Sequence, residues 1–196
     1  EVAPLGHAAL VRPMIEAIMA EAGLPWAALD AIAFGQGPGG FTGVRVAVSA
    51  AQGLALALDR PLIPVSSLQT LAMSCAAPRV LAAFDARKGE LYWAAYVRDA
   101  AGLPVLQGEE QVVAPAQAPI PDTQSWFGVG SGWQAHGPLL ATRLGSRLEG
   151  MDADALPQAS DLLRLALPRF LAGQVVDVED AAPVYIRPSQ AEENRR

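Results

Sequence analysis

The chain has 196 residues, of which 52% are hydrophobic, enough to bury an aliphatic core in one domain or two small lobes. Fourteen Lys and Arg against twenty Asp and Glu give a net charge of -6, so the sequence lacks the basic excess that commonly drives binding to a phosphate backbone. Cys75 stands alone and excludes an intrachain disulfide. No uninterrupted apolar run reaches the ~18 to 20 residues of a membrane-spanning helix. We therefore expect a folded cytoplasmic protein without a membrane segment, which meets RNA only through a partner.

The first predicted helix covers residues 8–22. Leu10, Met14 and Ile18 recur at helical spacing on one apolar stripe, and a glycine and a proline just beyond the stripe end the helix. Pro13 lies inside this pattern, so either the first turn is irregular or the helix begins just before the proline.

A glycine-rich turn follows the short strand predicted at residues 31–34. From residue 35 it reads Gly-Gln-Gly-Pro-Gly-Gly-Phe-Thr-Gly and leads into a helix expected at residues 42–58. That helix is apolar on most sides and rich in alanine, including Ala47 and Ala51. It is therefore either buried or packed closely on another helix.

The order of these elements predicts an α/β lobe over residues 1–77. A strand at residues 62–65 follows the second helix, and Ser66 opens a Ser-x-x-Gln capping box that starts a third helix. Strands that alternate with helices indicate a parallel or mixed sheet with helical cover.

A second α/β lobe is expected over residues 78–196. Strand-like runs at residues 79–85 and 90–97 flank Ala-Arg-Lys-Gly, which has the composition of a hairpin turn. We expect two further strands and a final helix, at residues 105–113, 125–129 and 160–172.

The glycine-rich turn fits neither standard nucleotide motif well. It satisfies G-x-G-x-x-G between a strand and a helix, but the next strand ends in Ser66 where an acidic residue would hold a ribose, and no P-loop lysine follows. The main interpretation is a tight turn that needs the positive φ of glycine, and weak anion binding at the helix start is the alternative. The candidate residues are Gly37, Gly39, Gly40, Thr42 and Gly43.

Six segments, taken together, point to one family. In chain order they read Gly-Pro-Gly-Gly-Phe-Thr-Gly-Val-Arg-Val-Ala from residue 37, Gln-Gly-Leu-Ala-Leu-Ala from 52, Pro-Val-Ser-Ser-Leu from 64, Phe-Asp-Ala-Arg-Lys-Gly-Glu-Leu-Tyr-Trp from 84, Gly-Ser-Gly-Trp from 130 and Ala-Pro-Val-Tyr-Ile-Arg from 182. In this order they closely resemble the family of TsaB, also called YeaZ, over nearly the whole chain.

The resemblance implies an actin-like, sugar-kinase-like fold of two lobes, shared with TsaD, the subunit that transfers the threonylcarbamoyl group to tRNA adenosine. In TsaD the strand matching residues 62–65 leads into an H-x-x-x-H pair that binds a metal, whereas the matching positions here are Ser67 and Leu71. Neither side chain replaces a histidine, so we expect no metal-dependent transfer. The family also opens with a strand hairpin carrying an Asp-Thr pair, which nothing before Glu1 supplies, so this hairpin is expected to be missing.

The remaining polar residues form no catalytic constellation. His7 and His136 are the only histidines and have no zinc-binding spacing. Ser131 lies in a Gly-Ser-Gly run that is interpreted as a flexible turn, and Asp85 and Glu90 bracket the hairpin turn as surface charges. We expect no cofactor, no metal and no enzyme acting alone.

The leading hypothesis is a scaffold that pairs with a TsaD-like catalytic subunit through the apolar faces of the first two helices. The interface candidates are Leu10, Met14, Ile18, Ala47 and Ala51, and the alternative is that these side chains serve the core of their own lobe. The resemblance also implies a homodimer when the chain is alone, a TsaE-like ATPase as third partner, and tRNA reached only through the complex. Two other hypotheses stay open: a nucleotide-binding phosphotransferase of the same fold, and a structural dimer with a separate role.

Overall fold

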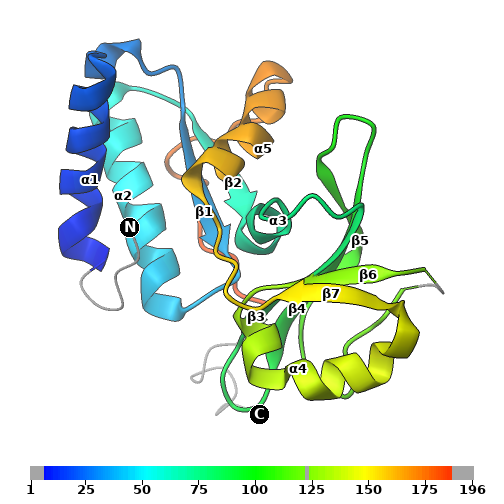
Figure 1. Ribbon diagram of the computed structural model, residues 1–196. Helices are drawn as coiled ribbons and strands as arrows, with labels where there is room; N and C mark the ends of the chain where they lie inside the picture. The colour runs from blue at the N-terminus through cyan, green and yellow to red at the C-terminus, as the bar shows by residue number, and fades with distance from the viewer. Residues whose placement is uncertain (1–6, 122–123, 187–196) are drawn as a thin grey trace.

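Two β-sheets, each between helices, make up the computed structural model, which describes residues 7–121 and 124–186 (Figure 1). The elements in chain order are α1 (His7–Ala22), β1 (Ile32–Gly37), α2 (Phe41–Leu58), β2 (Leu62–Ser66), α3 (Ser67–Ala72), β3 (Arg79–Asp85), β4 (Leu91–Arg98), β5 (Pro104–Val113), β6 (Trp126–Val129), α4 (Ser131–Leu144), β7 (Leu148–Asp152) and α5 (Ala159–Leu171). Short 3-10 helices lie at Trp26–Ala28 and Gly145–Arg147.

The first sheet consists of β1 and β2, which pair in parallel and lie between α2 and α5. On one face, Phe34 of β1 packs with Val44 and Val48 of α2. On the other face, alternate residues of β2 pack with Leu165 and Ala166 of α5. This arrangement confirms the alternation of strands and helices predicted for the first lobe.

α1 lies on the outside of the molecule, beside α2 (Figure 1). The helix begins at His7 and contains Pro13, so it starts well before the proline. None of the side chains described for residues 8–22 is fully buried. α1 is therefore the least embedded long helix of the described chain.

α2 is 18 residues long, and Arg45 is its only charged residue. By length and composition it is the one described helix that could cross a membrane, although no uninterrupted apolar run of that length was expected. Its inner side chains pack against the first sheet, and Ala55 at their far end is 1% exposed. α2 is thus a covering helix of the first lobe.

α3 begins where Ser66 caps it. The Ser66 hydroxyl accepts hydrogen bonds from the backbone N–H groups of Leu68 and Gln69 at 3.1 and 3.2 Å, which confirms the predicted cap. The Gln69 side chain does not return to Ser66, however, and donates to the carbonyl of Pro104 in β5 at 2.9 Å. The cap is therefore one-sided, and Gln69 links α3 to the second sheet.

The second sheet has the strand order β5-β4-β3-β6-β7. β3 pairs antiparallel with β4 and parallel with β6, which in turn pairs parallel with β7. Alternate residues of β3 point to opposite faces: Leu81 and Ala83 pack with Trp133 of α4, whereas Val80 and Ala82 pack with Leu71 of α3. α4 and α3 thus cover the two faces.

α4 and β7 were not predicted from the sequence. The Gly-Ser-Gly run expected to be a flexible turn contains the N-cap residue Gly130 and the first two residues of α4. α5 begins at Ala159, capped by no side chain, and continues through Pro168 to Leu171.

The chain returns to the first lobe after the second sheet. α5 packs on β1 and β2, and Val176 exchanges backbone hydrogen bonds with Leu62 at 2.8 and 2.9 Å. The Gln52 side chain of α2 then donates to the carbonyls of Val178 and Ala181. The first lobe therefore contains these late segments as well as the residues expected in it. Residues 187–196, included in the expected second lobe, lie outside the described residues.

Candidate protein-interaction face

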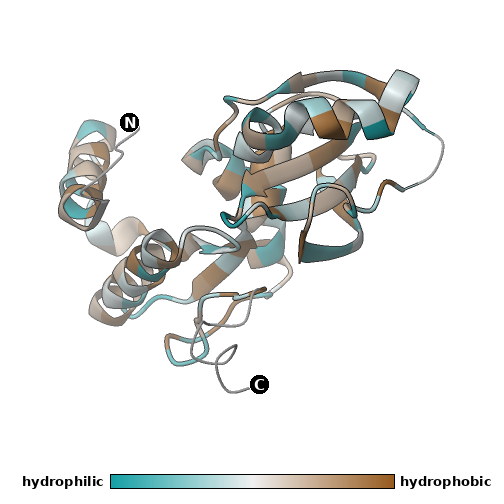
Figure 2. Cartoon of the chain, turned by 90° about the horizontal axis from the view of Figure 1, so that it is seen from below, coloured by the Kyte–Doolittle hydropathy of each residue, from teal (hydrophilic) through white to brown (hydrophobic). Residues whose placement is uncertain are grey.

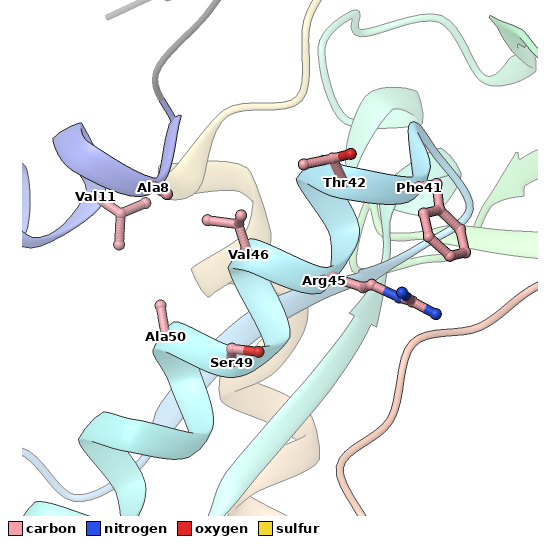
Figure 3. Close-up of a pocket in the computed structure, with 8 residues that line it drawn as sticks. All are labelled: Ala8, Val11, Phe41, Thr42, Arg45, Val46, Ser49 and Ala50. Atoms are coloured by element: carbon pink, nitrogen blue, oxygen red, sulfur yellow. The ribbon is translucent and has the colours of Figure 1, made fainter.

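The outer sides of α1 and α2 form one surface, which we call the helix-pair face. A groove of about 520 Å³ runs between the two helices, lined by Ala8 and Val11 of α1 and by Thr42, Arg45, Val46 and Ala50 among the residues of α2 (Figure 3). Small side chains that line such a groove allow a further helix to approach closely.

Large apolar side chains are exposed on or beside this face. Leu56 of α2 is 76% exposed, Ile18 of α1 is 60% exposed, and Phe41 at the start of α2 is 51% exposed. Figure 2 shows hydrophobic residues along much of α2. Large exposed apolar side chains on one face make that face a candidate interaction site.

The predicted interface residues occupy three different environments. Ile18 is exposed, whereas Leu10, Met14 and Ala47 are half-buried. Ala51 is 4% exposed and belongs to the core under α2, so its side chain serves the first lobe itself. The outward surface is formed instead by α1 and by outer residues of α2 such as Phe41 and Leu56.

Three residues absent from the predicted set form a stack at the rim of the groove. Arg45 donates from Nε to the hydroxyl of Tyr185 at 2.7 Å, and its Cζ lies 3.7 Å from the ring centroid of Phe41. The rings of Phe41 and Tyr185 are stacked with centroids 5.5 Å apart. Two of the segments that resemble the TsaB family contain these residues, but they lie 140 positions apart and no sequence pattern pairs them.

The glycine-rich turn packs against the returning C-terminal segment. Gly37 has φ +103°, and a Cβ there would lie 3.0 Å from the carbonyl oxygen of Val184, whose N–H donates to the Gln36 carbonyl at 2.8 Å. Gly39 lies against Val44, whereas Gly40 and Gly43 have open space around them and Thr42 lines the groove. At Gly37 a positive φ and a close backbone approach together require glycine.

A network of hydrogen-bonded polar side chains lies at the junction between the lobes. Ser66 and Tyr96 both donate hydrogen bonds to the carboxylate of Glu110, the latter at 2.6 Å. Burial, and then the neighbouring Glu110 carboxylate, raise the pKa of the Tyr96 hydroxyl above its ordinary value. Arg169 of α5 donates to the Pro64 carbonyl and to the Gln69 side chain, each at 2.6 Å, and its burial lowers its pKa. The network joins β2, α3, β4, β5 and α5.

The positions that match the TsaD histidines lie at this junction. Leu71 is fully buried in the core of the second lobe, and Ser67 is half-buried at the start of α3. Within residues 7–121 and 124–186, no cluster of three or more His, Cys, Asp or Glu side chains is placed to hold a metal ion.

Two other polar residues considered for catalysis, Asp85 and Ser131, make hydrogen bonds at the β3–β4 hairpin. The Asp85 carboxylate accepts from the Arg87 backbone N–H at 2.9 Å, and the Ser131 hydroxyl accepts from the Asp85 N–H at 3.2 Å. These contacts fix the β3–β4 hairpin against the start of α4, and none of them activates a nucleophile.

Comparison with known proteins shows which family this chain resembles along its length. A family model described as TsaD, tRNA N6-adenosine threonylcarbamoyltransferase, matches residues 1–194. The tRNA threonylcarbamoyladenosine biosynthesis protein TsaB of Escherichia coli (strain K12) is 41% identical over 194 residues, which are 95% of this chain and 83% of that protein. TsaB of Haemophilus influenzae is 38% identical over 202 residues, with 95% and 82% covered. The chain belongs to the TsaB (YeaZ) family.

The solved structure of YeaZ from Pseudomonas aeruginosa agrees with this assignment. It is 44% identical and superimposes with a TM-score of 0.87 over 94% of this chain and 86% of that one. The actin-like, two-lobed fold expected for a TsaB-family protein is therefore confirmed. Within this fold, hydrogen bonds join the two lobes at their junction, and a groove of the TsaB-family chain lies on the helix-pair face.

Proposed function

We propose that this chain is a non-catalytic subunit in the biosynthesis of threonylcarbamoyladenosine in tRNA, which binds and activates a TsaD-type transferase through the helix-pair face. The curated relatives that resemble it along nearly its whole length are named for that biosynthesis. The observation that carries the proposal is the exposed apolar surface over α1 and α2, with Ile18 and Leu56 mostly exposed.

A partner helix fits this surface better than a small substrate does. Small side chains such as Ala8 and Ala50 line the groove (Figure 3). Burying exposed apolar area contributes about 25 cal/mol per Å², so covering several large side chains supplies a substantial part of a stable association.

The further partners belong to the same proposal. A TsaE-type ATPase binds when the transferase is in place, and tRNA is reached through the transferase, in keeping with the net charge of -6 on this chain. In the absence of the transferase, a second copy covers the same face and gives a cytoplasmic homodimer.

The test is tRNA threonylcarbamoylation by a purified TsaD-type transferase, a TsaE-type ATPase and a threonylcarbamoyl-adenylate synthase, with and without the full-length form of this chain. Product is expected only when the chain is present. Equal product without it would overturn the proposal.

Matched variants locate the binding surface. Ile18→Glu places a charge on the helix-pair face, whereas Leu163→Glu places one on α5. In the wild type, Ile18 and Leu163 are each 60% exposed. Because exposure is equal, both variants should fold equally well, and only Ile18→Glu should lose pairing and activity. Equal loss from both variants would place the partner elsewhere.

A further inference from the structure

Arg45 is held in a fixed orientation at the rim of the groove. Its Nε donates to Tyr185, and its guanidinium plane lies over the Phe41 ring. Figure 3 shows the side chain extending beside Phe41 and away from α1. Stacking on one aromatic ring and bonding to another reduces the rotamer entropy that an exposed arginine would lose on binding.

The outer edge of this guanidinium has no partner among the described residues. Its two Nη groups make no hydrogen bond or ion pair with any residue in the described part of the chain. The planar pair of N–H donors at this edge matches the two oxygens of a carboxylate.

The surroundings also favour an anion. Ala8 and Thr42, from the first turns of α1 and α2, line the same groove as Arg45, so the positive ends of both helix dipoles lie at one end of this groove, although the Arg45 side chain itself extends away from α1. Neither helix has an acidic residue in its first turn. No acidic side chain in the first turn of α1 or α2 therefore offsets the positive charge at this end of the groove.

We propose that Arg45 is an anchor that binds a carboxylate side chain on a helix of the TsaD-type subunit seated in the groove. This inference rests on the proposed function and adds the chemistry of the contact: an apolar helix with an aspartate or glutamate at the end that meets the first turn of α2. A second copy of this chain is the competing occupant: Glu16 on its α1 already pairs with Arg12 at 2.7 Å and α2 has no acidic residue, which leaves Glu21 in the last turn of α1, and the outcomes of the test separate this copy from the transferase.

The test is the dissociation constant of the TsaD-type subunit for the full-length form of this chain carrying Arg45→Met. A lost charge-assisted hydrogen bond should weaken binding about 10- to 100-fold. Tyr185→Phe, which keeps the charge but removes its orienting hydrogen bond, should weaken binding less. The affinity of the wild type should fall more steeply with NaCl than that of Arg45→Met.

Arg164→Met is the matched control, because Arg164 is an exposed arginine of α5, outside the helix-pair face, that pairs with Asp161 at 3.6 Å. It should bind as the wild type does. If Arg45→Met binds with wild-type affinity and salt dependence, the anchor is overturned while the proposed function stands. If Arg45→Met weakens only self-association of the chain, the occupant is a second copy and the anchor for the transferase is overturned. If the wild type itself does not bind, the proposed function fails and the anchor fails with it.

Discussion

Gly128 lies where the backbone of β6 meets the indole ring of Trp133. A Cβ at this position would lie 2.3 Å from the Trp133 ring, which cannot move freely because its Nε1 donates to the Leu81 carbonyl at 3.0 Å. We expect Gly128→Ala to lower the free energy of unfolding by about 1–3 kcal/mol through overpacking, measured by urea denaturation.

Gly53 provides the opposite case. It lies in α2, and a Cβ there would meet no atom within 4 Å. Gly53→Ala should raise the free energy of unfolding by ~0.5–1 kcal/mol, because alanine loses less backbone entropy in a helix. Equal destabilisation by both variants would contradict the steric explanation.

Tyr96 makes the stability of the protein sensitive to alkaline pH. Burial and the Glu110 carboxylate raise the pKa of its hydroxyl above the ordinary value of about 10, so the native state favours the protonated form. The contribution of protonated Tyr96 to the free energy of unfolding is complete below about pH 10 and is lost as the pH rises toward the native pKa. The free energy of unfolding should therefore fall above pH 10 in the wild type, and less steeply in Tyr96→Phe. Identical pH profiles would show that Tyr96 is not the group responsible.

At the scale of elements, α1 depends on α2 for its position. No described side chain of α1 is fully buried, whereas α4 has Trp133 and Leu140 in the core of the second lobe. Amide hydrogens of α1 should exchange with solvent sooner than those of α4, measured by hydrogen–deuterium exchange, because local opening breaks fewer apolar contacts. Binding of the transferase should slow exchange in α1. Unchanged exchange in α1 with the transferase bound would contradict the proposed face.

The elements predicted with success carry strong local signals, and the missed ones do not. Ser66 caps α3 as its position in a Ser-x-x-Gln pattern indicates. α4 contains Gly132, Gly137 and Pro138, which have low helical propensity, and it forms because Trp133 and Leu140 pack on the second sheet. Such tertiary stabilisation is invisible in a local window of sequence.

The candidate site shows the same limit. The apolar stripe of α1 could be predicted, since residues at helical spacing share a face. The local sequence could not show that the Ala51 side chain faces the core beneath α2, or that Tyr185, 140 positions further along the chain, contacts Arg45. Both facts depend on how the first sheet places α2 and on the return of the chain after α5.

At the scale of the molecule, the two lobes are joined twice. The polar network around Glu110 connects the sheets, and Arg169 ties α5 to β2 and α3. We expect a single unfolding transition, with tryptophan fluorescence, which reports mainly on Trp93, Trp126 and Trp133 of the second lobe, coinciding with far-UV circular dichroism. Two separated transitions would show that the lobes unfold independently.

The return of the chain also sets an order of events during synthesis. β1 and β2 leave the ribosome before the second sheet, whereas α5 and the segment that pairs Val176 with Leu62 are made after it. At about 5–20 residues per second, the first sheet waits on the order of ten seconds with one face uncovered, while the second sheet is completed. The lobe that is translated first therefore finishes folding last, and a nascent chain stalled before residue 159 exposes the apolar face of β2 to the chaperones of the cell.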